Sequence, residues 1–180
     1  QAIEYNGVLP DIQGVIILDT MMEFNTSARS QTIPSEIEHT FAALFPSAYN
    51  SIKSDDFRGD FLNLFYRLPT KDSDLANEFK ATWNNEGRPH FELESFPLPY
   101  ENLDDIHGTD RDIAMNFLRS DHANFWVRGI PAIWLSDSAE FRGDMIQCYH
   151  QMCDNLQVML TEDNINFLGK TADTITNTLH

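Results

Sequence analysis

The chain has 180 residues, of which 42% are hydrophobic and 12% aromatic, a composition that can build a buried core and excludes a disordered polypeptide. Its 12 Lys and Arg residues stand against 28 Asp and Glu residues, so the formal net charge is −16. Because this charge repels phosphate backbones and anionic lipid surfaces, we expect no nucleic-acid or membrane partner.

The first predicted element is a buried strand. Residues 14–18 read Gly-Val-Ile-Ile-Leu, an apolar, β-branched run typical of a strand covered on both faces. Asp19 follows directly, and ligands of open α/β sheets bind at the carboxyl ends of the strands. Asp19 is therefore a candidate site residue, although an aspartate that caps a helix or a turn would give the same pattern.

Two helices are expected in the first half of the chain. A capping serine, early acids and apolar residues at helical spacing predict a helix over residues 35–45 that ends before Pro46. Residues 73–83 show a similar pattern. Residues 61–67 fit a helix or a strand equally well.

The second half alternates strands and helices. Residues 90–96 alternate like a half-buried strand that Pro97 and Pro99 end. A helix through residues 120–128 is followed by Gly129, which suits its carboxyl end. Residues 131–135 form a second buried run. A last helix opens at Thr161, and its apolar positions are Ile165, Leu168, Ala172, Ile175 and Leu179.

This order of elements predicts an α/β protein with a central sheet flanked by helices. We find no internal repeat, low-complexity tract or linker, so residues 1–180 are expected to form a single domain or a large piece of one.

The two cysteines flank a histidine. Cys148 and Cys153 are separated by four residues and can form a disulfide, with free or zinc-bound thiols as the alternative. A disulfide would place the protein in an oxidising compartment. The triplet Asn25-Thr26-Ser27 has the form of a glycosylation site, which is compatible with an extracellular, secreted glycoprotein.

Chemistry-bearing residues surround His150. A loop closed by a disulfide would hold this histidine rigidly, as a metal ligand requires, and Asp154 could orient its ring. The hydroxyl of Tyr149 could donate a hydrogen bond to a developing oxyanion. A surface turn held by the disulfide would explain the same residues without chemistry.

Three segments together resemble metallopeptidase family 28, the two-zinc aminopeptidases and their relatives, which include glutaminyl cyclases. Residues 14–19 resemble the strand and aspartate that bind one zinc. Residues 119–122 (Arg-Ser-Asp-His) and 129–132 (Gly-Ile-Pro-Ala) resemble the signature before the last core strand, and residues 149–150 (Tyr-His) resemble the block that supplies a histidine to the other zinc. The flanking cysteines look like those of bacterial secreted aminopeptidases.

The resemblance implies a mixed, mostly parallel central sheet, with this chain as the C-terminal half of the zinc aminopeptidase-like domain. It implies that Asp19 and His150 are ligands of two zinc ions and that Tyr149 is the oxyanion donor. Arg119 and Asp121 would lie near the substrate pocket.

The family also requires an upstream His-x-Asp and a Glu-Glu pair, which provide three metal ligands and the general base. Neither precedes Asp19, and the chain contains no adjacent Glu pair. We therefore expect an N-terminal chain of the same precursor, whose removal would leave Gln1 as a processed end, to complete an enzyme that hydrolyses N-terminal residues from peptides. A catalytically inactive relative with a binding or structural role is the alternative, and glutaminyl cyclase-like activity is a further one. Because the family varies at His122, this residue is expected to be a structural histidine.

Overall fold

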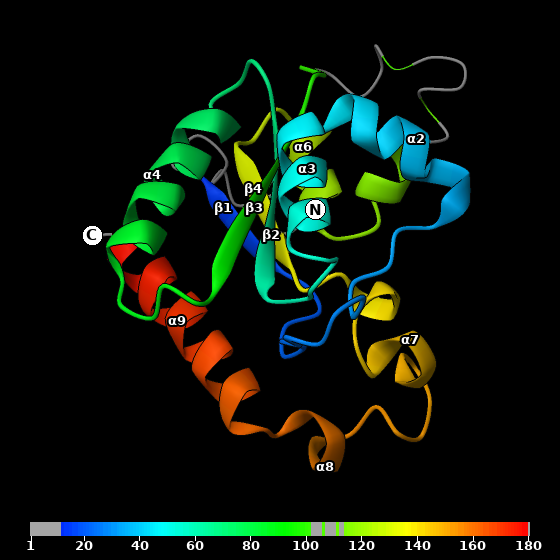
Figure 1. Ribbon diagram of the computed structural model, residues 1–180. Coiled ribbons are helices and arrows are strands. Elements are labelled where there is room, and N and C mark those ends of the chain that lie inside the picture. Colours follow the sequence, from blue (N-terminus) through cyan, green and yellow to red (C-terminus); the bar gives the residue numbers. More distant parts are fainter. Residues whose placement is uncertain (1–11, 102–105, 107–110, 112–113, 180) are drawn as a thin grey trace.

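The described strands form a single sheet. The computed structural model describes residues 12–101, 106, 111 and 114–179, which Figure 1 shows as coloured ribbons. The strand order is β1-β4-β2-β3, with the bounds Val15–Leu18, Ala132–Ser136, Phe61–Arg67 and Glu92–Leu98. β1 pairs with β4 and β2 with β3 in parallel, whereas β2 and β4 are antiparallel. The chain is therefore an α/β protein with a mixed sheet, as the sequence predicts. Gln1, the expected processed end, lies outside the described residues.

Residues 61–67, which fit either a helix or a strand, form β2. All seven side chains are buried. Leu62 and Leu64 belong to the core on one face of the sheet, and Phe61 and Phe65 belong to the core on the other. A strand covered on both faces has no polar alternation, which is why its period could not be assigned from the sequence.

One face of the sheet is covered by α4 (Asp72–Asn85) and α9 (Glu162–Thr178), which lie side by side in Figure 1. Phe79 and Phe167 are fully buried between these helices and the strands, and each such side chain stabilises the fold by about 1.5–3 kcal/mol. The core residues of this layer are Phe24, Leu62, Leu64, Tyr66, Ala76, Phe79, Trp83, Phe91, Ile133, Leu135 and Phe167.

The opposite face packs against α2 (Ser35–Leu44), α3 (Pro46–Ser54) and α6 (His122–Trp126), which lie on the other side of the strands in Figure 1. Its core residues are Phe45, Ala48, Ile52, Phe61, Phe65, Phe96, Leu98, Phe117, Trp126, Ala132 and Trp134. The fold thus has three layers, with the sheet in the middle.

The shorter elements connect these layers. They are η3 (Met115–Phe117), η4 (Ala139–Phe141), α7 (Met145–Cys148) and α8 (Leu156–Met159). Across the described part of the chain, no helix has the length and apolar character needed to cross a membrane.

Proline and helix ends differ in part from the sequence predictions. Pro46 begins α3 directly after α2, because proline is tolerated in the first turn of a helix. Pro97 lies inside β3, which is possible because β3 is an edge strand of the sheet.

The helix expected through residues 120–128 is shortened to α6. Gly129 has the expected left-handed backbone, with φ of +67°.

The side of α9 that packs on the core differs from the side that the sequence predicts. Thr161 caps it as expected, but Ile165 is 49% exposed and Leu179 is 67% exposed. The buried side carries Phe167 and several polar residues. These are Asn164, Lys170, Thr171, Thr174 and Thr178.

Local hydrogen bonds explain why α9 can bury this polar side. The hydroxyls of Thr171 and Thr174 donate to the carbonyls four residues earlier, at 3.0 and 2.8 Å. The ammonium group of Lys170 donates to the carbonyl of Arg88 at 3.0 Å. Because these buried groups are paired, they avoid the penalty of unsatisfied polar atoms, and hydropathy alone misses the buried face.

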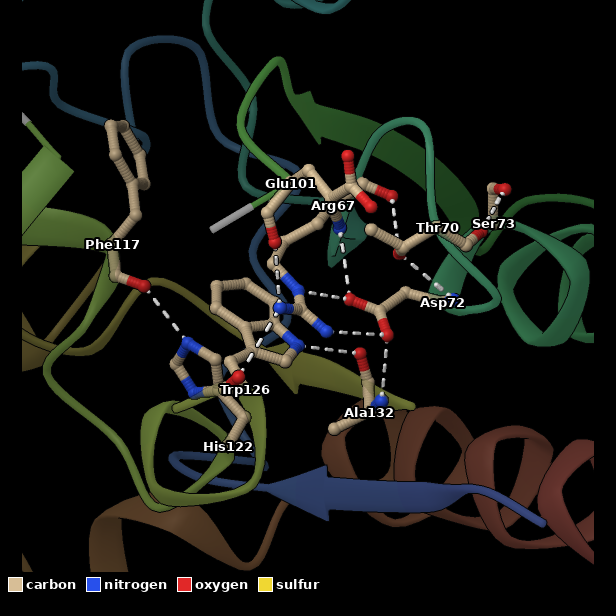
Figure 2. A network of polar contacts seen from close by, with 9 residues as sticks. All are labelled: Arg67, Thr70, Asp72, Ser73, Glu101, Phe117, His122, Trp126 and Ala132. Carbon is tan, nitrogen blue, oxygen red and sulfur yellow. Dashed lines mark hydrogen bonds and ion pairs between the residues drawn. The ribbon is translucent and has the colours of Figure 1, made fainter. Parts of the chain in front are cut away.

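A buried ion pair joins the end of β2 to the start of α4 and the start of β4 (Figure 2). The guanidinium of Arg67 contacts the carboxylate of Asp72 at 2.7 and 3.1 Å, and both side chains are at most 5% exposed. The same carboxylate accepts the N–H of Ala132 at 3.0 Å. Arg67 also donates to the carbonyls of Glu101 at 2.9 Å and Trp126 at 3.3 Å.

Replacing Asp72 by Ala should strongly destabilise the fold. The change leaves the Arg67 guanidinium buried without its counter-ion, which costs about 3–5 kcal/mol. Chemical denaturation measures this difference. The matched control is Asp74→Ala in the same helical turn, where the side chain is exposed and the loss should stay below about 1 kcal/mol. Equal losses for the two variants would contradict the role given to the ion pair.

Carboxylates gather at the start of β3. Burial raises the pKa of Glu94 to about 7; a hydrogen bond with Ser51 of α3 opposes the shift, while Glu92 and Asp60 add to it. Burial, followed by the charge of Asp55, also raises the pKa of Asp60 to about 6. This region therefore holds protons that an unfolded chain would release at the same pH.

Glu94 should make the protein less stable as pH rises. Its folded pKa of about 7 exceeds the ordinary value of 4.5, so its contribution is fully present below pH 4.5 and is lost as pH rises through 7. The shift corresponds to about 3 kcal/mol. Glu94→Gln should remove this part of the pH dependence of the unfolding free energy, measured by denaturation across that range. The exposed control Glu78→Gln should leave the dependence unchanged, and an unchanged profile for Glu94→Gln would refute the prediction.

Candidate functional site

The carboxyl ends of β1 and β4 meet at one edge of the sheet. Asp19 follows β1, and its N–H donates to the carbonyl of Leu135 at 3.1 Å. The hydroxyls of Thr20 and Ser136 lie 2.8 Å apart. Because β2 is antiparallel to β4, its start lies at the same edge, where Asn63 donates to the carbonyl of Ser136 at 2.7 Å. Polar side chains from three strands therefore converge there.

A cavity of about 240 Å³ opens at this edge. Its volume equals roughly eight water molecules at about 30 Å³ each and lies below the range of about 300–1,000 Å³ for drug-sized ligands. It therefore suits a group the size of one amino acid. Much of the lining is aromatic, with Phe41, Phe61, Phe65, Phe96, Phe117 and Trp134. The polar lining includes Asp19, Thr20, Asn63, Arg119, Ser136, Glu140 and Tyr149.

Arg119 and Glu140 form an ion pair in the cavity lining. Nη1 of Arg119 lies 2.7 Å from Oε1 of Glu140, and the two side chains are 46% and 28% exposed. Because solvent screens such a pair, it stabilises the fold by at most about 1 kcal/mol. The second carboxylate oxygen of Glu140, Oε2, is buried and has no hydrogen-bond partner among the described residues. An unpaired buried acceptor is costly, so a donor that reached it would be favoured.

Tyr149 lines the same cavity. Burial raises the pKa of its hydroxyl, the charge of Glu140 adds to the shift, and Arg119 opposes it. The hydroxyl therefore stays protonated at neutral pH and can donate a hydrogen bond to a ligand oxygen.

A buried guanidinium holds the loop between Glu140 and Tyr149 against the sheet. Arg142 is fully buried, and its Nη1 donates to the carbonyl of Phe61 at 2.5 Å. Its Nε donates to the side chain of Gln31 at 2.9 Å. Burial lowers the pKa of Arg142 to about 10, which still leaves the guanidinium charged at neutral pH. The loop is thus fixed to the start of β2.

Asp137, which directly follows β4, also fixes segments near the cavity by hydrogen bonds. Its carboxylate accepts the backbone N–H groups of Met22 and Glu23, each at 2.9 Å, and that of Ala139 at 3.1 Å. Burial raises the pKa of Asp137, and the charge of Arg142 opposes the shift. These bonds join the segment after β1 to the segment after β4, and so fix the edge of the cavity.

His150 lies beside the cavity and does not line it. The residue is exposed, and its ring stacks on the ring of Tyr149 with centroids 4.0 Å apart and an interplanar angle of 16°. The structure joins Cys148 and Cys153 in a disulfide, which closes the loop that carries both rings. Asp154 accepts the backbone N–H of His150 at 3.3 Å, so it holds the loop and not the ring that it was expected to orient.

The structure separates the two residues expected near the substrate pocket. Arg119 lines the cavity, whereas Asp121 is exposed at the start of α6 and is not part of the lining.

His122 behaves as a structural histidine. The residue is fully buried, and its Nε2 lies 2.9 Å from the carbonyl oxygen of Phe117 (Figure 2). Its ring stacks on the ring of Trp134, with centroids 4.8 Å apart. Burial lowers its pKa to about 4, so the ring is neutral at pH 7. This neutral ring supports the wall of the cavity from behind Trp134.

Asn25 is partly exposed, and the two residues after it are exposed. The side-chain oxygen Oδ1 of Asn25 accepts the backbone N–H of Ser27 at 3.0 Å, and its side-chain Nδ2 donates to Oε1 of Glu23 at 3.5 Å. The predicted glycosylation site thus lies at the surface, in a short turn.

The described residues do not complete a zinc site. Among them, no three or more His, Cys, Asp or Glu side chains come together in a group that could hold a metal ion. Asp19 and His150 would supply two ligands, fewer than the three protein ligands of a typical catalytic zinc. We therefore derive no catalytic step through zinc.

Comparison with known proteins adds no relative. No protein-family model, curated protein or solved structure matches the chain. The function must therefore be argued from the site itself.

Several cavity residues were not predicted from the sequence. Asp137, which fixes the edge of the cavity without lining it, comes two residues after the apolar run 131–135, so the reasoning used for Asp19 could have identified it. Asn63 and Glu140 had no such signal, because they reach the cavity only through the antiparallel placement of β2 and the anchoring of the loop by Arg142.

The cysteine pair should resist alkylation in the native protein. The disulfide between Cys148 and Cys153 leaves no free thiol among the described residues, so mass analysis without reduction should find no labelled cysteine. After reduction, two alkyl groups should be added. Two thiols that react in the native, unreduced protein would contradict both the bond and the prediction of secretion.

Proposed function

We propose that this chain is the substrate-binding part of a secreted, zinc-dependent aminopeptidase. The observation that carries the proposal is the cavity at the carboxyl ends of β1 and β4. Asp19, Arg119 and Tyr149 come from three distant segments of the sequence and line this one cavity. These are three of the residues that the resemblance to two-zinc aminopeptidases assigns to metal or substrate, and His150 stacks directly on one of them.

The residues of the chain have separate tasks in this proposal. The aromatic part of the cavity holds the side chain of the first residue of a peptide. The protonated hydroxyl of Tyr149 donates a hydrogen bond to the carbonyl oxygen as negative charge develops there. Asp19 and His150 take two metal-ligand positions, and an N-terminal chain of the same precursor supplies the remaining ligands and the general base.

A binding protein without catalysis is the second candidate. It is favoured by the lack of a three-ligand metal group in the described part of the chain. In that case the cavity would retain its ligand without hydrolysing it. Zinc content separates the two candidates.

The test uses the protein purified from its source together with any chain that copurifies. We expect about two zinc ions per complex, measured by elemental analysis, and hydrolysis of leucyl amide substrates. Asp19→Ala and His150→Ala should each lose bound metal and activity, because a ligand is removed. His39→Ala is the matched control, since His39 is exposed on α2 and does not line the cavity.

Tyr149→Phe should keep the zinc and lower kcat by about 10²–10³-fold, the usual effect of removing one oxyanion donor. A native complex without zinc, or variants of Asp19 and His150 with unchanged metal content and activity, would reject the aminopeptidase and leave the binding protein.

A further inference from the structure

A second cavity, of about 400 Å³, lies between α7, α8 and the segment after β1. Its volume falls within the range of about 300–1,000 Å³ for ligand pockets, so it can take large apolar side chains. The apolar lining consists of Met21, Met22, Ala139, Met145, Leu156 and Met159. Four of the six methionines of the chain therefore line this one cavity. Because thioether side chains are flexible and polarisable, such a lining can adapt to an apolar partner of irregular shape.

Large apolar side chains around the second cavity are exposed. Leu156, which lines it, is 69% exposed, and Leu160, which directly follows α8, is 57% exposed. Met152 lies in the loop that the disulfide closes and is 97% exposed. Single exposed apolar residues are ordinary, but a group of them beside an apolar cavity is typical of an interaction site. We call the second cavity together with Met152 and Leu160 the methionine surface. It includes α8, at the lower end of the molecule in Figure 1.

The charge around the methionine surface is negative. Residues 12–28 and 143–169, which supply most of it, contain no Lys or Arg. Asp154 lines the second cavity and forms no ion pair with a described residue. Glu162 is exposed in the first turn of α9, three residues after Met159 of the lining. These carboxylates therefore lack a cation from their own segments of the chain.

This charge decides between the possible occupants of the methionine surface. A second copy of the chain would bring a net charge of −16 and the same carboxylates to the contact, which repel each other. Residues 1–11 of the chain carry Glu4 and Asp11 and no Lys or Arg, so they do not complement the surface either. A segment in which Lys or Arg alternates with large apolar side chains at helical spacing matches both the carboxylates and the methionines. An amphipathic helix laid into an apolar groove is a common mode of such recognition.

We propose that the methionine surface binds a basic amphipathic helix of a partner protein. The apolar side chains of the helix would enter the second cavity, while its Lys or Arg side chains would contact Asp154 and Glu162. The inference goes beyond the proposed function, because it needs neither zinc nor catalysis. Thr20, Ala139 and Tyr149 line both cavities, so the bound helix would lie beside the aromatic cavity and not inside it.

Fluorescence anisotropy with labelled synthetic helices tests the class of partner. The protein is purified from its source together with any chain that copurifies, and the probe is an amphipathic helix of Leu and Lys, about 14 residues long. A helix with Glu in place of every Lys should bind at least about tenfold more weakly, because it loses the charge-assisted contacts. A peptide of the same Leu and Lys content whose order gives no apolar face should lose about as much, because it cannot fill the cavity.

Variants then locate the binding surface. Leu156→Ser should weaken binding of the Leu/Lys helix about tenfold, because a large buried side chain is lost from the contact. The matched control is Val127→Ser, since Val127 is 71% exposed at the end of α6 and does not line the second cavity. Asp154→Asn should weaken binding about threefold and lower its salt dependence, because an exposed ion pair contributes little. Glu78→Gln is the charge control, and circular dichroism verifies that each variant folds.

Several outcomes would overturn the inference. They are failure of the wild-type protein to bind the Leu/Lys helix, equal binding of the Glu helix, and equal losses in Leu156→Ser and Val127→Ser. A dimer found by light scattering that Leu156→Ser dissociates would assign the surface to a second copy instead. Zinc content and peptide hydrolysis can fail while binding of the basic helix persists, so this inference and the proposed function are tested separately.

Discussion

The ion pair of Arg67 and Asp72 joins the end of β2 to the starts of α4 and β4. Its carboxylate accepts the first N–H of β4, while its guanidinium ends β2 and contacts the carbonyl at the end of α6. These contacts lie where β4 runs beside β2, and β1 pairs with the other edge of β4. Since both charges are almost fully buried, removing either one leaves the other without compensation. The junction of these three elements therefore depends on both partners of the pair.

β2 is held at both ends by buried arginines. Arg67 is its last residue and lies over the ring of Trp126 at 5.3 Å. At the other end, Arg142 contacts the carbonyl of Phe61 and lies over its ring at 4.4 Å. The first arginine fixes the sheet, and the second fixes the loop that brings Glu140 and Tyr149 to the cavity. β2 therefore takes part in both the sheet and the cavity, because Phe65, which lines the cavity, lies between these two fixed ends.

Much of the fold was predictable because local patterns dominate it. The apolar run of β1, the periodicity of α4 and the cap of α9 each depend on neighbours in sequence. The carboxyl-edge rule likewise found Asp19. Two features escaped prediction. β2 shows no alternation because both its faces are buried, and α9 buries a polar face whose hydroxyls are paired within the helix, which hydropathy does not register. The role of Glu140 follows from a loop held by Arg142, which sequence spacing does not show. Zinc binding and peptidase activity remain predictions.

The pairing of the first strand with the last has a consequence for the order in which the chain folds. Val15 lies opposite Ala132, 117 positions later (132 − 15), so β1 has no strand partner among the described residues until nearly three quarters of the sequence exists. Contacts of such separation slow folding, because the loop must close before they contribute. During synthesis, the residues of β1 would remain unpaired until β4 is made. β2, α4 and β3 follow one another along the chain, so they can pack together earlier. The edge of the cavity can form only after β4 lies between β1 and β2, because the carboxyl ends of β1 and β4 meet there.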